Sequence, residues 1–120
     1  MAERKINTIP LFKSAIFTGS GTSGTAGPFD MRDYHLNGAA LIYTLSPIGV
    51  GTCGTLDITY SVCSVYDGTY IVAGTFGTSV GTAGGSDARS VTIIPAPFIK
   101  VIAGMGTSGS GSFTAHLHVR

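Results

Sequence analysis

Hydrophobic and polar residues alternate along much of the chain with a period of two, the pattern that predicts β-strands with one buried face. Residues 55–64 place Leu, Ile, Tyr and Val at every second position, between Thr, Asp, Ser and Cys. Residues 113–120 repeat this pattern, with Phe, Ala, Leu and Val predicted to face a core. No segment shows a convincing helical period, so the pattern predicts an all-β protein.

Eight strands follow from this pattern and from the turn residues between the strands. The predicted strands are Leu11–Thr18, Phe29–Tyr34, Ala39–Ser46, Thr55–Ser64, Ile71–Phe76, Arg89–Ile94, Phe98–Ala103 and Phe113–Arg120. Asp67 and Gly68 mark a hairpin between the fourth and fifth strands, and both are expected at positive φ. Pro95 and Pro97 mark a corner between the sixth and seventh strands, because proline has no N–H to donate to a central ladder.

The connections between these strands alternate in length. Long connections rich in Gly, Ser and Thr occupy residues 19–28, 47–54, 77–88 and 104–111, and shorter ones occupy residues 35–38, 65–69 and 95–97. Alternate connections of an antiparallel sandwich lie at the same end, so the four long loops are expected to share one end. Eight strands in this layout predict a single antiparallel β-sandwich of the jelly-roll kind, with an immunoglobulin-like sandwich as the alternative.

Composition narrows the class of protein further. The chain has 120 residues, of which 18 are Gly, 15 are Thr and 12 are Ser, while charged residues make up 11% and the formal net charge is +1. A helical bundle needs more Glu and Lys, and charge-driven disorder needs a high net charge, so both are excluded. The length suits one domain, predicted as a sandwich over residues 11–120 that follows an N-terminal arm over residues 1–10.

Charge and hydropathy also bear on partners and location. A net charge near zero lacks the basic footprint that nucleic-acid binding requires. The charged N-terminal residues are followed by no long apolar run, so neither a secretory signal nor a membrane span is expected. The chain is therefore expected to be intracellular at synthesis, with neither nucleic acid nor membrane among its partners.

Two histidines are the strongest candidates for metal chemistry. His116 and His118 lie two positions apart on the polar face of the last strand, and this spacing can present two imidazoles to one metal ion. A third ligand from His35 or Asp57 cannot be placed from the sequence. The favoured interpretation is two exposed histidines on a solvent-facing or subunit-facing strand, with no metal.

The remaining residues give little support to catalysis. Cys53 and Cys63 are expected to be free thiols, because an extended strand between them would span roughly 30 Å. Cys53 has no neighbouring base in the sequence, and no pair of carboxylates can be assigned to acid–base work. Gly-x-Gly-x-x-Gly patterns begin at Gly19, Gly49 and Gly104 but open no helix, so they do not predict a dinucleotide site. We therefore expect neither enzymatic activity nor a cofactor.

Three stretches of the chain carry a family resemblance. They are residues 51–62 (GTCGTLDITYSV) leading to the Asp67-Gly68 turn, residues 94–103 (IPAPFIKVIA) and residues 106–120 (GTSGSGSFTAHLHVR). Together they resemble small all-β structural proteins of tailed bacteriophages over roughly residues 39–120. Gly54 and Gly109 stand where proline is common in such proteins, and Lys100 stands where arginine is expected.

The resemblance implies a component of the virion, assembled in the host cytoplasm. A capsid decoration or cement protein that bridges capsid subunits is the first expectation, and a neck, tail or fibre-attachment protein is the alternative. A sugar- or surface-binding module is the third hypothesis, although Trp is absent. The expected partners are the major capsid protein or other virion proteins, with a homo-oligomer formed on the shell. The predicted subunit-contact arm contains Arg4, Lys5, Ile6, Ile9 and Pro10.

Overall fold

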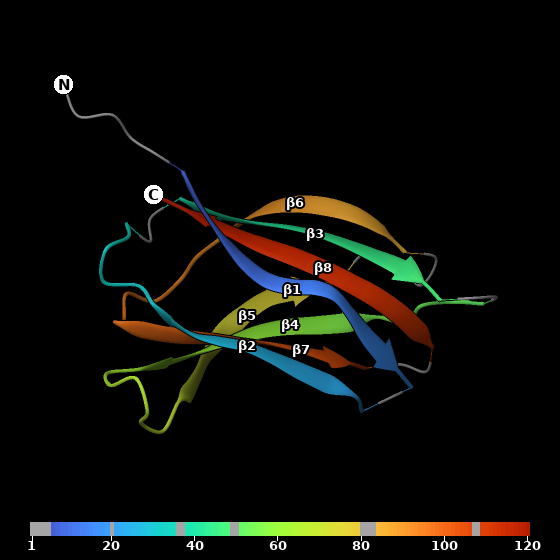
Figure 1. Cartoon of the computed structure of the whole chain (residues 1–120), viewed down its shortest axis with the longest axis horizontal. Coiled ribbons are helices and arrows are strands. Elements are labelled where there is room, and N and C mark those ends of the chain that lie inside the picture. Colours follow the sequence, from blue (N-terminus) through green and yellow to red (C-terminus); the bar gives the residue numbers. More distant parts are fainter. Residues whose placement is uncertain (1–5, 20, 36–37, 49–50, 80–83, 107–108) are drawn as a thin grey trace.

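The structure of the chain is an eight-stranded β-sandwich. The computed structural model describes residues 6–19, 21–35, 38–48, 51–79, 84–106 and 109–120. The strands are β1 (Asn7–Thr18), β2 (Ser23–Asp30), β3 (Ala39–Pro47), β4 (Leu56–Cys63), β5 (Ile71–Thr78), β6 (Gly85–Val91), β7 (Phe98–Met105) and β8 (Ser110–Val119). Figure 1 shows them as two layers with the strands running along the long axis of the molecule.

The strand order is that of a jelly roll. Sheet A has the order β1-β8-β3-β6 and sheet B has the order β2-β7-β4-β5, with antiparallel neighbours in both. Each strand of the first half therefore pairs with its counterpart from the second half, β1 with β8, β2 with β7, β3 with β6 and β4 with β5. This is a long antiparallel ribbon wrapped into two sheets, which confirms the predicted sandwich and differs from the immunoglobulin order.

The period-two pattern places one face of each sheet in a common core. β8 alternates strictly between buried and half-buried positions from Gly111 to Val119, and β7 does so from Ile99 to Met105. Phe113 is fully buried, and its ring centroid lies 5.6 Å from those of both Phe12 and Tyr43. Alternation therefore identifies the core of these strands directly from the sequence.

Two predicted strands are wrong in position. The predicted strand Phe29–Tyr34 is instead β2, which begins at Ser23 inside a predicted loop. The Phe12 and Phe17 rings pack close to Gly24: a Cβ at this position would lie only 3.3–3.4 Å from them. Glycine therefore suits this position of the strand. The predicted strand Arg89–Ile94 is instead β6, which begins at Gly85 and ends at Val91.

Two smaller corrections concern proline and a turn. β1 begins at Asn7 rather than Leu11, because Pro10 lies in an edge strand, where a missing N–H is tolerated. The hairpin between β4 and β5 is confirmed, but its connection spans residues 64–70 and Gly68 does not adopt positive φ. The Gly68 N–H instead donates to the Val65 carbonyl (3.3 Å), so the turn is wider than the two-residue type predicted.

The four connections rich in Gly, Ser and Thr share one end of the sandwich, as predicted (Figure 1, right), and we call it the long-loop end. Their predicted greater length is wrong: they span residues 19–22, 48–55, 79–84 and 106–109, against residues 31–38, 64–70 and 92–97 at the other end, because the strands extend into the predicted loops. Hydrogen bonds tie three of them together: the Gly19 N–H donates to the Gly109 carbonyl (2.7 Å), and the Ser110 N–H donates to the Thr52 carbonyl (3.2 Å). Gly109 has φ +146° and lies so close that a Cβ would be 2.5 Å from the Gly54 nitrogen. The described parts of this end are therefore packed backbone against backbone.

Arg89 joins the two sheets at the edge formed by β5 and β6. Its guanidinium donates to Asp87 (2.6 Å) and to the Tyr43 hydroxyl (2.8 Å) on sheet A. The same group donates to the carbonyls of Phe76 and Thr78 on β5 of sheet B, both at 3.2 Å. It therefore covers carbonyl groups of an edge strand that would otherwise invite pairing with another chain.

Replacing Arg89 is expected to destabilise the sandwich. Arg89→Met should lower the free energy of unfolding in urea by about 2 kcal/mol, because it removes charge-assisted hydrogen bonds at a mostly buried site. Arg32→Met is the matched control: Arg32 also pairs with an Asp two residues earlier at 2.6 Å, but its side chain is 65% exposed against 23% for Arg89. The control should change stability by no more than about 0.5 kcal/mol. Equal losses in both variants would contradict the bridging role.

Candidate functional site

The end of the sandwich opposite the long-loop end, which we call the short-turn end after the turns predicted there, carries most of the large apolar side chains that are exposed in the described residues. It is formed by the connections between β2 and β3, β4 and β5, and β6 and β7 (Figure 1, left). Nine large hydrophobic residues are exposed in the described part of the chain, and six of them belong to this end. These six are Ile6, Val65, Tyr66, Ile71, Val72 and Ile94.

Four of these residues form two consecutive pairs on one hairpin. Val65 and Tyr66 lie in the β4–β5 connection, and Ile71 and Val72 open β5; we call these four the hairpin patch. Ile71 and Val72 are 69% and 67% exposed, although they lie next to each other at the start of an edge strand. Exposed apolar groups of this size are typical of a surface that contacts another protein.

Neighbouring side chains hold the hairpin patch in a fixed shape. The Tyr66 ring packs edge-on against Phe98 at 5.7 Å, and the Tyr70 hydroxyl donates to the Tyr66 carbonyl (2.7 Å). The Lys100 ammonium lies 4.4 Å from the centre of the Tyr70 ring. Partial burial raises the pKa of Tyr70 above its ordinary value. Tyr66 is therefore presented with less conformational entropy left to lose on binding than an unrestrained side chain.

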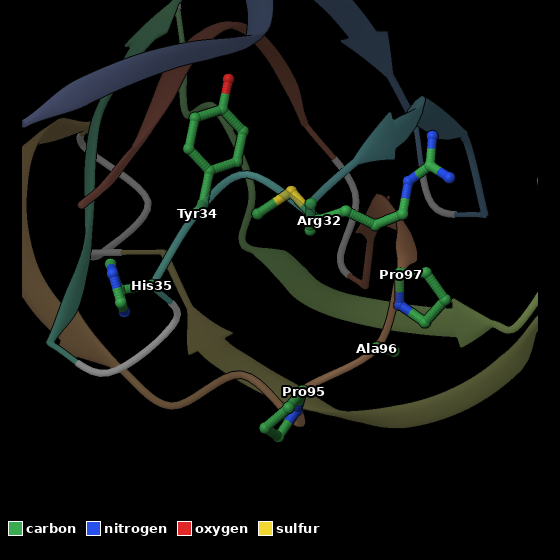
Figure 2. Close-up of a pocket in the computed structure, with 7 residues that line it drawn as sticks. Arg32, Tyr34, His35, Pro95, Ala96 and Pro97 are labelled. Carbon is green, nitrogen blue, oxygen red and sulfur yellow. The ribbon is translucent and has the colours of Figure 1, made fainter.

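A groove of about 460 Å³ opens beside the patch at the same end. Figure 2 shows its walls on two connections that lie opposite each other, with Arg32, Tyr34 and His35 on one and Pro95 to Pro97 on the other. Met31, only 2% exposed, also lines it, and the Met31 N–H donates to the Pro97 carbonyl (2.8 Å), which ties the two walls together. The groove offers shape and apolar surface rather than a nucleophile beside a base.

An exposed ion pair flanks the groove. The Arg32 guanidinium donates to Asp30 through Nε (2.9 Å) and a terminal nitrogen (2.6 Å), and it stacks 5.3 Å from the Phe98 ring centre. The side-chain hydrogen bond from Arg32, followed by the backbone hydrogen bond from the same residue, lowers the pKa of Asp30 to about 2. Arg32 is thus held against the protein surface by its own neighbour.

The outer face of sheet A is a second surface of distinct chemistry. The register pairs its outward residues in rows across all four strands. These paired residues carry hydroxyl, imidazole or aliphatic side chains: Thr8, Pro10, Ile16, Ala40, Ile42, Thr44, Ser46, Ser86, Ala88, Ser90, Ser112, Thr114, His116 and His118. Such a face loses little hydration free energy when another surface covers it, because it has no full charges to desolvate in these rows.

The structure separates the residues of the predicted arm. Ile9 is buried in the core at 7% exposure, and Pro10 lies opposite His116 in the sheet, so both belong to the sandwich. Ile6 precedes β1 and is 68% exposed. Arg4 and Lys5 lie outside the described residues. The predicted subunit-contact role of the arm stays a prediction, and it can concern only the residues before Asn7.

The other sequence candidates stay apart. Cys53 is buried before β4, Cys63 ends β4, and both are free thiols, as expected. His116 and His118 lie side by side, but no third His, Cys, Asp or Glu of the described residues joins them in a cluster. Within the same residues there is no helix with the length and apolarity of a membrane span.

The hairpin patch and Arg89 were missed from the sequence. One signal for the patch was present: Val65-Tyr66 and Ile71-Val72 are consecutive apolar pairs, and in an extended segment one member of each pair must face outward. Arg89 gave no such signal, because its partners Tyr43, Phe76 and Thr78 come from two other strands.

The fold and surfaces define a jelly-roll β-sandwich with two candidate contact surfaces, and solved structures share this fold. No protein-family model and no curated protein matches the chain. A chain in the structure of infectious bursal disease virus, Gx strain, is 21% identical with a TM-score of 0.59. A chain of T=1 particles derived from infectious bursal virus is 19% identical with the same TM-score. Each match covers 96% of this chain and 31% of the viral chain.

A bacterial protein shares the fold as well. Dimeric latent PorU from Porphyromonas gingivalis is 10% identical with a TM-score of 0.51, over 95% of this chain and 12% of that one. The chain thus spans less than a third of the length of each of these proteins. At these identities the likeness concerns the fold alone.

The ion pair beside the groove makes a prediction about pH. NMR titration should give Asp30 a pKa of about 2, and Arg32→Gln should return it towards the ordinary value of 3.8. Because the folded-state pKa is lowered, the pair contributes stability above the unfolded pKa and loses it as the pH falls towards 2. This contribution is small, because both side chains are exposed. An unshifted Asp30 in the unmodified protein would show that the pair does not form in solution.

Proposed function

We propose that the protein is a non-enzymatic structural component of a bacteriophage virion, and specifically a capsid decoration or cement protein that stabilises the head by bridging capsid subunits. The observation that carries this proposal is the concentration of exposed apolar side chains at the short-turn end. The fold likeness to chains of virus particles supports a place in a virion. The sequence resemblance to structural proteins of tailed phages supports the choice of a phage.

The short-turn end has the properties that a bridging protein needs. Covering the hairpin patch removes apolar surface from water, and the free energy gained stabilises the assembled shell by mass action. The patch sits on a hairpin fixed by Tyr66, Phe98 and Tyr70, so binding orders little that was mobile. The partner at this end is the major capsid protein, and copies of the chain form a homo-oligomer on the shell.

The residues before β1 extend this contact. β1 begins at the short-turn end, so the exposed Ile6 lies at the same end of the sandwich as the hairpin patch (Figure 1). Arg4 and Lys5 come directly before Ile6 and add positive charge to an apolar contact. An arm of this composition suits an acidic, partly apolar groove on a neighbouring subunit.

Imaging of particles made by the genome that encodes the chain tests the function. Cryo-electron microscopy should place this sandwich at many equivalent positions over the shell. Copies confined to a ring at one vertex would instead make it a neck or tail protein. Absence of the sandwich from purified particles would overturn the virion assignment altogether.

Removing the hairpin patch should weaken attachment to particles. Ile71→Ser combined with Val72→Ser should reduce binding to particles stripped of the protein by at least about tenfold, because each side chain contributes more than 1 kcal/mol when buried. Ile48→Ser is the matched control, since Ile48 is 42% exposed at the long-loop end. Thermal melts should show both variants folded, because the replaced side chains are exposed.

The same binding assay tests the arm. A chain that lacks residues 1–6 keeps all of β1 and its buried Ile9, so it should fold but bind less tightly. Undiminished binding of both the truncated chain and the patch variant would mean that attachment uses another surface.

A further inference from the structure

Two histidines stand side by side on the outer face of sheet A. β8 is an inner strand of this sheet, with β1 on one side and β3 on the other, so its backbone is held on both edges. His118 pairs with Thr8 and Ala40, and His116 pairs with Pro10 and Ile42. None of these four paired neighbours carries a charge, and Arg120, two residues beyond His118, directs its guanidinium towards Gly38.

The distance between the two rings slightly exceeds that of two imidazoles on a shared metal ion. Zinc lies about 2.0–2.1 Å from an imidazole nitrogen, hence roughly 3 Å from the ring centre, so two rings on one ion have centres within roughly 6 Å of each other. The ring centroids of His116 and His118 are 6.4 Å apart and the planes differ by 34°. The rings must therefore rotate about their side-chain bonds and approach each other before one nitrogen of each can bind a common ion.

A hydroxyl group already orients one of the rings. Thr8 Oγ1 lies 3.1 Å from His118 Nδ1. When Nδ1–H donates to this oxygen, Nε2 carries the free lone pair and becomes the metal-binding nitrogen. Metal-ligating histidines are commonly held in this way through their second ring nitrogen.

We propose that His116 and His118 form a binding site for a divalent transition-metal ion, with zinc as the test case. Imidazole is a preferred ligand of Zn²⁺, Ni²⁺ and Cu²⁺, and two such ligands on a rigid strand chelate one ion. The described residues supply these two protein ligands, and water completes the coordination. The proposal stands apart from the virion function, because it rests only on the geometry of β8 and Thr8.

Calorimetric titration of ZnCl₂ into the metal-free full-length chain tests the site. The unmodified protein should bind zinc, and His116→Ala and His118→Ala should each weaken binding by more than about tenfold. Thr8→Val should weaken it to a smaller extent, because it removes the orienting hydroxyl and leaves both imidazoles. His35→Ala is the matched control, since His35 lies in the β2–β3 connection and should leave the affinity unchanged.

NMR of the histidine side chains distinguishes this site from other zinc binding. Zinc should shift the ring signals of His116 and His118 before those of His35. Lack of zinc binding by the unmodified protein would overturn the proposal. Unchanged affinity in the His116→Ala, His118→Ala double variant would also overturn it, because zinc would then be held elsewhere, for example at Cys63. All the replaced residues lie outside the core, so melts in EDTA should show each variant folded.

Discussion

Closure of the sandwich at its β5–β6 edge depends on the Arg89 guanidinium, which links sheet A to the carbonyls of Phe76 and Thr78. Gly77, at φ +110°, makes this possible, because a Cβ there would lie 2.6 Å from the guanidinium nitrogen. The position of the Arg89 guanidinium divides β5 into two parts. Its end is covered by Arg89, while Ile71 and Val72 at its start remain exposed. The two exposed apolar residues of β5 thus lie in the part of this edge strand that Arg89 does not cover.

The two ends of the sandwich consequently differ in chemistry. At one end, hydrogen bonds and close backbone packing around Gly109 join three of the connections rich in Gly, Ser and Thr to one another. At the other, the connections present exposed aromatic and aliphatic side chains, and two of them line a groove. The glycine-rich composition therefore allows close backbone packing at one end, and the hairpin at the opposite end exposes the apolar side chains of the proposed contact. The outer face of sheet A is a third kind of surface, where paired residues across the strands carry hydroxyl and imidazole groups and no full charges.

Much of the fold could be predicted from the sequence, because alternation reports burial wherever a strand has one face in the core. β4, β7 and β8 are of this kind. The bounds of β2 and β6 were predicted wrongly, because both strands lie at sheet edges and are rich in Gly, Ser and Ala. These residues give only a weak alternation of hydrophobic and polar positions. The contact surface was harder to predict, since it depends on which apolar residues the topology leaves uncovered. Ile9 and Ile71 look alike in the sequence, but only the pairing of β1 with β8 puts Ile9 in the core.

The central claim is that the short-turn end is the surface by which the protein attaches to a shell. Hydrogen–deuterium exchange on the free chain and on the particle-bound chain tests this most directly, because it reports which backbone amides become covered. The account predicts added protection in residues 64–72 and 92–97, with little change around residues 52–55 and 109–111. Protection confined to the long-loop end, with the β4–β5 hairpin exchanging as in the free chain, would contradict it.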